Sequence, residues 1–347
     1  MRVERVTPGK RAPARLVGSI LSRDLAIAGQ RWAKGRRLTA DDLLALAGAD
    51  SADPVSVLIL EGGELHEDDA ALRLAAAVAG QGLKVRGPAQ SRVDLVAEAH
   101  GVANVRVADL ERVNRIDPLE VFTVFDGQIV APGELVASVK VAPHVVDAST
   151  VDAGARLAGF GSNPLVWVAP FVPRRVGVLV KETVRATARE RFETSVRAKV
   201  EGLGSTIASI SYVDDDPDAV EAAMAELVRG PDAVELILTA GAASTDPLDP
   251  CFVAIAALGG RVVRRGVPAH PGSMLWLARI GRTAILGLPT CGAYSKATAA
   301  DLLLPRLLSG EDASERTVAK LGHGGILTRS QRFRFPAYAR ELDAPDG

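Results

Sequence analysis

The fold is decided by residues 234–258, whose sequence is VELIL-TAGAASTDPLDP-CFVAIAAL. The apolar run 234–238 predicts a buried strand, and the small residues of 239–250 predict a turn. Residues 251–258 have an apolar helical pattern that Gly259 and Gly260 bring to an end. A parallel α/β sheet presents backbone N–H groups to an anion through this order of strand, small-residue loop and helix.

Residues 283–308 repeat the same order. A buried strand is predicted at 283–288, a turn at 289–292 and a helix at 294–308. Because the carboxyl ends of parallel strands meet at one sheet edge, the two loops are expected to frame a crevice for a phosphorylated ligand.

The region before these two repeats continues the alternation. Strands are predicted at 176–180 and 205–213, and helices at 185–202 and 217–228. Such an alternation predicts an α/β domain over residues 174–310, with a mostly parallel, doubly wound sheet covered on both faces.

The preceding residues are expected to form N-terminal accessory units that are α+β or β-rich. An accessory β/α unit spans 1–50, has no evident core of its own and contains the predicted strand 15–21 and the predicted helix 38–47, which Thr39 caps. The second region, 51–173, has a strand at 54–60, a helix at 70–79, an Asp-Gly hairpin within 121–130 and a connector at 147–173. Residues 311–347 form a C-terminal tail without clear periodicity.

Composition narrows the classes of function. The chain has 347 residues, 48% of them hydrophobic, with a formal net charge of −1 and only 4% aromatic residues. A nearly neutral chain with few aromatic residues gives no reason to expect nucleic acid or an anionic membrane as partner. Cys251 and Cys291 have no metal-type spacing, and neither a signal sequence nor a membrane span is evident, so a cytoplasmic location is expected.

Two side chains of the accessory region have two interpretations each. His66 lies in Glu64-Leu65-His66-Glu67 and could bind a metal ion, or it could belong to an ordinary helix start rich in acidic residues. Arg115 could bind an anion or pair with a surface carboxylate.

Four motifs together resemble a known family. They are T-A-G-A-A-S at 239–244 with Asp249, P-G-S at 271–273, G-L-P at 287–289 and D-D-P at 215–217. Their order and spacing resemble those of MoeA-like molybdopterin-binding proteins, whose main domain is of the MoaB/Mog type. The resemblance covers residues 175–310. It extends over most of the chain in a branch associated with molybdenum hydroxylases, through residues 64–67, N-R-I at 114–116, 288–295 and 321–325.

The resemblance implies molybdopterin or adenylylated molybdopterin as ligand, with Mg²⁺ and molybdate as further candidates. It also implies a homodimer and a molybdenum hydroxylase as client. The residues expected to bind the cofactor are Thr239, Gly241, Ala242, Ser244, Asp246, Pro271, Gly272, Ser273, Pro289, Gly292, Ser295 and Lys296.

Each group of candidates has a chemical role. Residues 241–244 could form a nest of backbone N–H groups for a phosphate, and Ser295 and Lys296 could reach the same anion. Asp249 is the candidate catalytic and metal-binding residue, although it could equally be the N-cap of the next helix. Cys291 is interpreted as a small apolar filler.

The sequence departs from the family pattern where metal insertion is concerned. No D-R-S-A-M-D-G-Y-A run and no T-G-A-P-L-P loop occur, and Val180-Lys181-Glu182-Thr183 replaces a T-G-D/N-E turn. Ser273 stands where the family has lysine, and residues 290–292 replace a G-N-P turn. Ligand binding is expected to survive these changes more easily than catalysis.

Three functions therefore stay open. The chain binds molybdopterin in cofactor biosynthesis or delivery, or it is a molybdotransferase that inserts molybdate into adenylylated molybdopterin. It could also be an unrelated binder of a nucleotide or phosphate ligand, although neither G-x-G-x-x-G nor a P-loop lysine motif supports this.

Overall fold

The computed structural model describes residues 1–50, 53–159, 163–181, 186–242, 244–288 and 297–340. Contacts divide the chain into two compact units. Unit 1 comprises Met1–Ala99, Asn104–Asp126 and Pro132–Val168, and unit 2 comprises His100–Ala103, Gly127–Ala131 and Ala169–Gly347. Among the described residues, none of the helices has the length and apolarity needed to cross a lipid bilayer.

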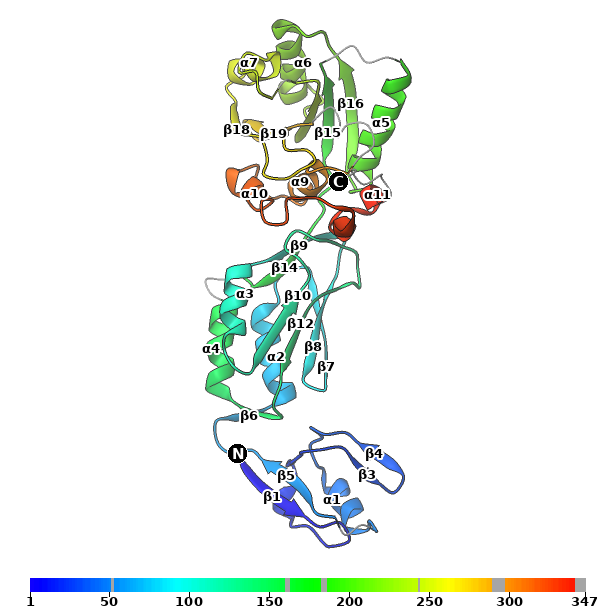
Figure 1. Ribbon diagram of the computed structural model, residues 1–347, viewed down its shortest axis with the longest axis vertical. Helices are drawn as coiled ribbons and strands as arrows, with labels where there is room; N and C mark the ends of the chain where they lie inside the picture. The colour runs from blue at the N-terminus through cyan, green and yellow to red at the C-terminus, as the bar shows by residue number, and fades with distance from the viewer. Residues whose placement is uncertain (51–52, 160–162, 182–185, 243, 289–296, 341–347) are drawn as a thin grey trace. The chain divides into compact units, whose positions relative to one another are not determined.

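Unit 2 is built on a six-stranded sheet with the order β16-β15-β17-β20-β19-β18 (Figure 1). Its strands are β15 (Arg175–Val180), β16 (Thr206–Tyr212), β17 (Leu236–Ala240), β18 (Arg261–Arg265), β19 (Trp276–Ile280) and β20 (Thr283–Gly287). The first four strands of that order are parallel, and β19 pairs antiparallel with both β20 and β18. The predicted fold class, a mostly parallel α/β sheet, is confirmed.

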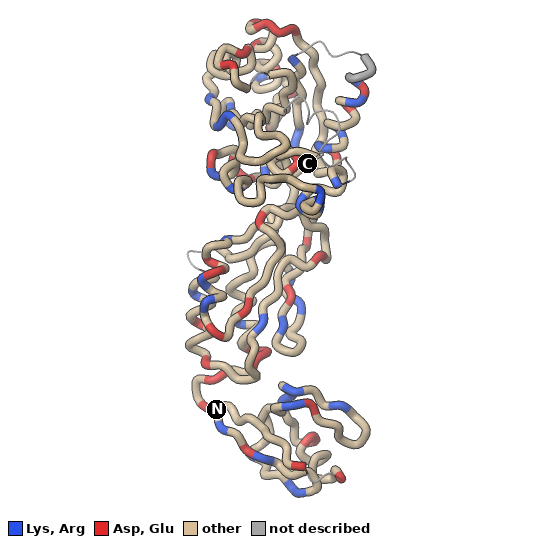
Figure 2. Tube along the Cα trace, viewed as in Figure 1, with Lys and Arg blue, Asp and Glu red and all other residues tan. Residues whose placement is uncertain are grey.

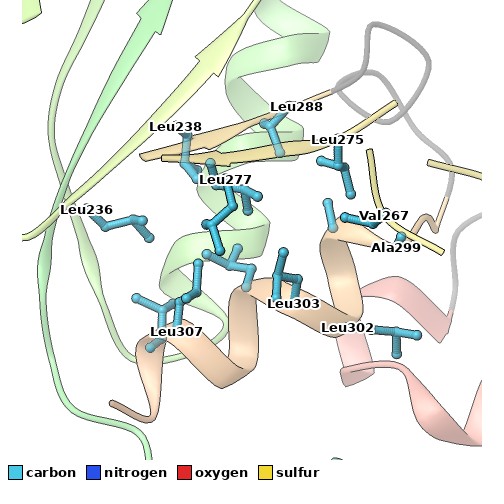
Figure 3. Packing of buried hydrophobic residues seen from close by; sticks show 14 of the residues in the cluster. Leu236, Leu238, Val267, Leu275, Leu277, Leu288, Ala299, Leu302, Leu303 and Leu307 are labelled. Atoms are coloured by element: carbon cyan, nitrogen blue, oxygen red, sulfur yellow. The ribbon is translucent and has the colours of Figure 1, made fainter. Parts of the chain in front are cut away.

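Both faces of this sheet are covered, because its central strands are apolar on both sides. Val178 and Leu238 face a core that includes α5 (Ala186–Glu201) and α9 (Ala300–Leu308). Ile237 faces a second core with α6 (Pro217–Arg229) and α7 (Pro250–Ala257). Figure 3 shows the first core, where Leu303 and Leu307 of α9 lie beneath Leu236, Leu238 and Leu277.

A buried ion pair fixes the start of α9 to α5. Lys199 Nζ donates to Asp301 Oδ1 at 2.5 Å, and the two side chains are 1% and 0% exposed. Asp301 Oδ2 also accepts from the backbone N–H of Thr298 at 2.9 Å. The ring of Tyr338 lies 5.5 Å from the Lys199 ammonium, which ties the C-terminal segment to the same charge.

The C-terminal segment, predicted as a tail without clear periodicity, contributes described residues to the core. It contains α10 (Glu315–Ala319), the 3₁₀ helix η3 (Arg329–Arg334) and α11 (Ala337–Arg340). These elements are too short to show periodicity in the sequence. Apolar side chains of these elements and of the residues between them are nevertheless buried in the first core, and they are Val318, Leu321, Leu327, Phe335 and Ala339.

Unit 1 contains several small antiparallel sheets. Their strands are β1 (Arg2–Val6), β2 (Ile20–Leu21), β3 (Leu25–Ile27), β4 (Gln30–Trp32), β5 (Val55–Ile59), β6 (Glu64–His66), β7 (Leu83–Ala89), β8 (Arg92–Ala97), β10 (Leu119–Thr123), β12 (Leu135–Val141) and β13 (Val145–Asp147). Its helices are η1 (Ala14–Leu16), α1 (Ala40–Ala47), α2 (Glu67–Val78), α3 (Val107–Asn114) and α4 (Ala148–Ala158). The sheet orders are β1-β5-β2, β3-β4, β13-β6 and β10-β12-β8-β7. A further sheet, β11-β9-β14, is formed by β9 (Gly101–Val105), β11 (Ile129–Val130) and β14 (Val166–Pro170).

The first sixty residues have an apolar core of their own, which corrects the expectation that they lack one. It includes Leu16, Trp32, Leu46 and Val57. β5 pairs with β1 and β2, so this strand shares a sheet with residues of the first region. The predicted helix 38–47 is confirmed as α1, where Thr39 accepts from Asp42 N and the Asp42 side chain accepts from Thr39 N in a capping box.

Three further local predictions were wrong. Most of the predicted strand 15–21 is a turn, in which Leu16 N donates to Pro13 O and Gly18 has a φ of +87°, so only its last two residues form β2. The predicted connector contains α4 and β14. The pattern of α4 was obscured by small residues such as Gly154, where an added Cβ would lie 2.4 Å from Leu119 Cδ1.

The predicted Asp-Gly hairpin does not form between β10 and β11. Asp126 accepts from the backbone N–H of Val105 at 3.0 Å, and Gly127 N donates to Ala103 O at 2.8 Å. These bonds tie the turn to β9, so β11 pairs with β9 while β10 pairs with β12.

The packing of the C-terminal segment generates a prediction. Leu321→Ala removes a side chain that is 2% exposed and is expected to lower the free energy of unfolding by about 2–5 kcal/mol. Ile326→Ala is the matched control, because Ile326 lies in the same segment and is 80% exposed, and its effect should stay within about 0.5 kcal/mol. Equilibrium urea unfolding followed by circular dichroism measures both. Equal effects of the two substitutions would contradict the packing.

Candidate functional site

Three neighbouring parallel strands of unit 2 end at one edge of the sheet. β15, β17 and β20 are neighbours, and Val180 lies opposite Ala240, as Thr239 lies opposite Gly287. Ligands of open α/β sheets bind outside these carboxyl ends. The residues that follow β15 and β17 are therefore candidates for a binding site.

The loop after β17 begins with a left-handed residue. Gly241 has a φ of +90°, which a side chain would disfavour, and Ala240 O accepts from the backbone N–H of Lys181 at 2.9 Å. Ser244 is half-buried in this loop. The Asp246 side chain, a predicted ligand, accepts from the backbone N–H of Leu248 at 2.9 Å and so stabilises the turn.

Thr239 has a buried hydroxyl at the end of β17. The residue is 1% exposed, and its Oγ1 has no hydrogen-bond partner within the described part of the chain. Buried hydroxyl groups are normally hydrogen-bonded. Since Thr239 borders the loop, this orphaned oxygen is consistent with a ligand group that completes the site.

Asp249 is the N-cap of α7 and also half of a buried ion pair. Its Oδ1 accepts from the backbone N–H of Cys251 at 2.9 Å, and its Oδ2 accepts from Lys181 Nζ at 2.8 Å. Asp249 was considered as a metal-binding residue or as an N-cap, and the structure shows it as the N-cap. Both carboxylate oxygens are engaged within the protein.

Lys181 was missed as a site residue by sequence reasoning. Its ammonium group bridges Asp249 and Asp215, with a second bond of 2.7 Å to Asp215 Oδ1. The Lys181 side chain is 4% exposed, whereas Asp215 is 66% exposed. The available signal was a lysine directly after the buried strand 176–180, in place of the small-residue turn of the family motif.

The two carboxylates hold the lysine in its charged form. Burial lowers the pKa of Lys181, but the hydrogen bonds to Asp215 and Asp249 outweigh it and raise the pKa above its ordinary value. Burial also raises the pKa of the neighbouring Cys251 thiol to about 12. Cys251 is therefore a protonated core residue and not a nucleophile.

The site does not fit a divalent cation at Asp249. Mg²⁺ requires near-octahedral oxygen ligands, while both oxygens of Asp249 already face N–H donors. Within the described residues, no group of three or more histidine, cysteine or acidic side chains could hold a metal ion.

His66, the other candidate metal ligand, lies in unit 1 and uses both ring nitrogens. Its Nδ1 accepts from the backbone N–H of Asp68 at 3.1 Å, so the hydrogen is on Nε2, which donates to Gly35 O at 2.8 Å. Arg115 is exposed at the end of α3, and the adjacent Asn114 is hydrogen-bonded to the backbone of Val121.

The Pro271-Gly272-Ser273 turn packs against the start of α9. Gly272 has a φ of +103°, and a Cβ there would lie 2.9 Å from Ala299 N, which donates to Pro271 O. The turn is thereby placed beside the residues that follow the second predicted loop. Pro289, Gly292, Ser295 and Lys296, together with Cys291, lie outside the described residues.

This part of the chain is similar to a known protein family. A family model described as a probable molybdopterin binding domain matches residues 178–309. A search of curated proteins found no match.

Similar solved structures include a molybdopterin biosynthesis enzyme MoaB from Thermus thermophilus, with 22% identity, a TM-score of 0.30, and coverage of 41% of this chain and 99% of that chain. A molybdopterin biosynthesis MoeA protein from Pyrococcus horikoshii is 13% identical, with a TM-score of 0.31 and coverage of 93% of this chain and 77% of that chain. A molybdenum cofactor biosynthesis protein B is 15% identical, with a TM-score of 0.26 and coverage of 44% and 93%.

The buried lysine generates a prediction about stability. Lys181→Met leaves the buried Asp249 carboxylate without its cation and is expected to lower the free energy of unfolding by about 3–5 kcal/mol. The double variant Lys181→Met/Asp249→Asn keeps an oxygen for the N-cap and removes the unpaired charge, so it should recover part of the loss. Lys320→Met is the control, because Lys320 pairs with Glu311 near the surface and should cost about 1 kcal/mol or less.

The same measurement has an expected pH dependence. Because folding raises the pKa of Lys181, the ion pair stabilises the fold fully below the unfolded pKa of about 10.4, and its contribution is lost as the pH rises through the folded pKa. The difference between wild type and Lys181→Met should thus be constant at neutral pH and shrink in alkaline solution. A double variant no more stable than Lys181→Met, or a difference that grows with pH, would contradict the pairing.

Proposed function

We propose, from the match of residues 178–309 to a family model described as a probable molybdopterin binding domain, that the chain binds molybdopterin or its adenylylated form without inserting the metal. The proposed binding surface comprises the β17–α7 loop and residues 289–296. The protein would hold the cofactor, or deliver it to a client enzyme, as part of molybdenum cofactor biosynthesis.

The β17–α7 loop has the chemistry that the ligand needs. Molybdopterin carries a terminal phosphate, which backbone N–H groups at a small-residue loop can bind together with hydroxyl donors. Gly241 and Ala242 let the ligand approach the backbone closely, and Ser244 and Thr239 supply hydroxyl groups. When bound, the ligand supplies the dithiolene that holds molybdenum.

One observation carries the proposal of a binder rather than an insertase. Lys181 places its ammonium group between Asp249 and Asp215, where an insertase would need free carboxylates for a hard cation. An ammonium group neutralises these carboxylates and cannot act as a Lewis acid. Asp249, the candidate catalytic residue, is thus part of an ion pair that stabilises the fold.

The predicted transferase activity, the magnesium ion, the homodimer and the hydroxylase client stay predictions. Metal insertion would require Asp249 to exchange Lys181 for a metal ion. Breaking a buried, hydrogen-bonded ion pair costs several kcal/mol, which a transient substrate would have to offset.

The binding surface is tested by adding bulk and charge in the loop. Ser244→Arg is expected to weaken the binding of adenylylated molybdopterin at least about tenfold, because a long side chain would fill the approach to the backbone. Ser209→Arg is the matched control, since Ser209 is exposed on β16 away from the loops. Isothermal titration calorimetry on the full chain measures both. Unchanged binding by Ser244→Arg would show that the ligand binds elsewhere.

The absence of insertion is tested separately. Purified protein incubated with adenylylated molybdopterin, Mg²⁺ and molybdate is expected to form no molybdenum cofactor above the rate without protein. The assay is reconstitution of a cofactor-free molybdenum enzyme, with a known insertase as positive control. Turnover that disappears in Asp249→Asn would overturn the binder proposal and establish a transferase.

A further inference from the structure

Unit 1 contains a second candidate site, which goes beyond the proposed function. It is a cavity of about 180 Å³ whose polar lining residues are Lys34, Glu67, Gln90, Ser91, Lys140 and His144. These residues come from four separate segments of the sequence, which are the loop after β4, the start of α2, the β7–β8 turn and the end of β12 with the residues just after it.

A carboxylate orients the histidine of this cavity. Glu67 is 5% exposed, and its Oε2 lies 2.9 Å from His144 Nδ1. A carboxylate only accepts hydrogen bonds, so Nδ1 carries the hydrogen and Nε2 is left for another group. Within the described part of the chain, Nε2 of His144 has no hydrogen-bond partner. The side chain is 18% exposed, so a ligand in the cavity can reach it.

The backbone of Gly35, the residue after Lys34, packs closely against Glu67 and His144. Gly35 O accepts from His66 Nε2, and a Cβ on Gly35 would lie 2.1 Å from Glu67 Oε1. Gly35 also has a φ of +80°, so both its conformation and its surroundings require glycine. Lys34 precedes this residue, and its exposed side chain lines the cavity.

The two lysines of the cavity form no ion pair with any described residue. Nearby basic side chains are neutralised, since Arg86 and Arg92 pair with Asp94 and Arg37 pairs with Asp69. Lys140 lies in register with Glu120 on β10 and Arg92 on β8, yet Glu120 makes no ion pair with it. Figure 2 shows acidic and basic residues interspersed along the chain. The Asp24 carboxylate accepts from the backbone N–H of Lys34 at 2.9 Å, so one of the two lysines has an acidic neighbour outside the cavity lining.

The β7–β8 turn adds a polar side chain to the wall. Gln90 and Ser91 have φ values of +51° and +63°, a conformation that glycine or asparagine adopts more readily. The Ser91 backbone N–H donates to Asp68 Oδ1 at 3.0 Å, which leaves its hydroxyl to the cavity lining. Serine at such a position supplies a hydrogen-bonding group that glycine could not.

The charges select the class of ligand. Lys34 and Lys140 contribute two positive charges, and Glu67 contributes one negative charge that His144 already binds. A metal cation would meet two ammonium groups and a single carboxylate, whereas an oxyanion would meet two ammonium groups, a hydroxyl and an imidazole. We propose that this cavity binds a tetrahedral oxyanion, either phosphate or molybdate, through Lys34, Lys140, Ser91 and His144, with Glu67 as the positioning residue for His144.

The test uses the full chain and each anion alone. Isothermal titration calorimetry should show one saturable site per chain for phosphate or for molybdate, and the tighter of the two identifies the source of the anion. Lys34→Gln and Lys140→Gln are each expected to weaken binding roughly fivefold or more, because each removes a unit charge near a dianion. His144→Gln should weaken binding as well, and Glu67→Gln should do so only by releasing the ring of His144.

A matched lysine provides the control. Lys84 is exposed on β7 of the same unit and does not line the cavity, so Lys84→Gln should bind the anion like the wild type. Circular dichroism shows whether each variant is folded. The proposal is overturned if neither anion binds in the millimolar range, or if Lys34→Gln and Lys140→Gln, both folded, bind as tightly as Lys84→Gln. None of these outcomes depends on molybdopterin binding by residues 178–309.

Discussion

The structure of unit 2 depends on the burial of β15 and β17 from both sides. Leu238 and Ile237 are consecutive residues that face opposite cores, and neither is exposed to solvent. A strand of this kind requires helices on both faces, and a helix can connect parallel strands only by crossing over the sheet. The crossovers bring the loops after these strands to one edge, so apolar burial determines where the polar site lies.

That same burial explains the role of Lys181. The residue directly follows β15, where the chain has just left the core and solvent is still excluded. A lysine there must have partners, because an unpaired buried charge is costly. Asp249 and Asp215 provide them, and one of these carboxylates also caps α7. The ion pair thus connects the end of β15 to the start of α7 and engages the Asp249 carboxylate within the protein.

Much of unit 2 could be predicted from the sequence, because its elements are long and their periodicity is strong. β15, β17 and α6 were predicted to within a few residues, and Asp216 with Pro217 marked the start of α6 correctly. β18 and β19 were missed, because a Gly- and Pro-rich segment separates their short apolar runs. The predicted site loop stays a prediction, and the pairing of Asp249 with Lys181 could not be read from the sequence, because Lys181 lies 68 residues before Asp249.

Unit 1 shows why a motif alone does not determine chemistry. His66 and Glu67 are adjacent in a sequence that suggests metal binding, yet they have different roles. His66 is the N-cap of α2 and is fixed by two backbone groups, whereas Glu67 is the first residue of the helix and reaches His144 through a long-range contact. The two residues jointly hold Gly35 in place, His66 by a hydrogen bond to its carbonyl and Glu67 by its close approach to the space where a Cβ would lie. A metal site would need both side chains to point at one ion. Here His66 donates to Gly35 O, whereas Glu67 accepts from His144. What the motif builds is one wall of a cavity that two lysines complete.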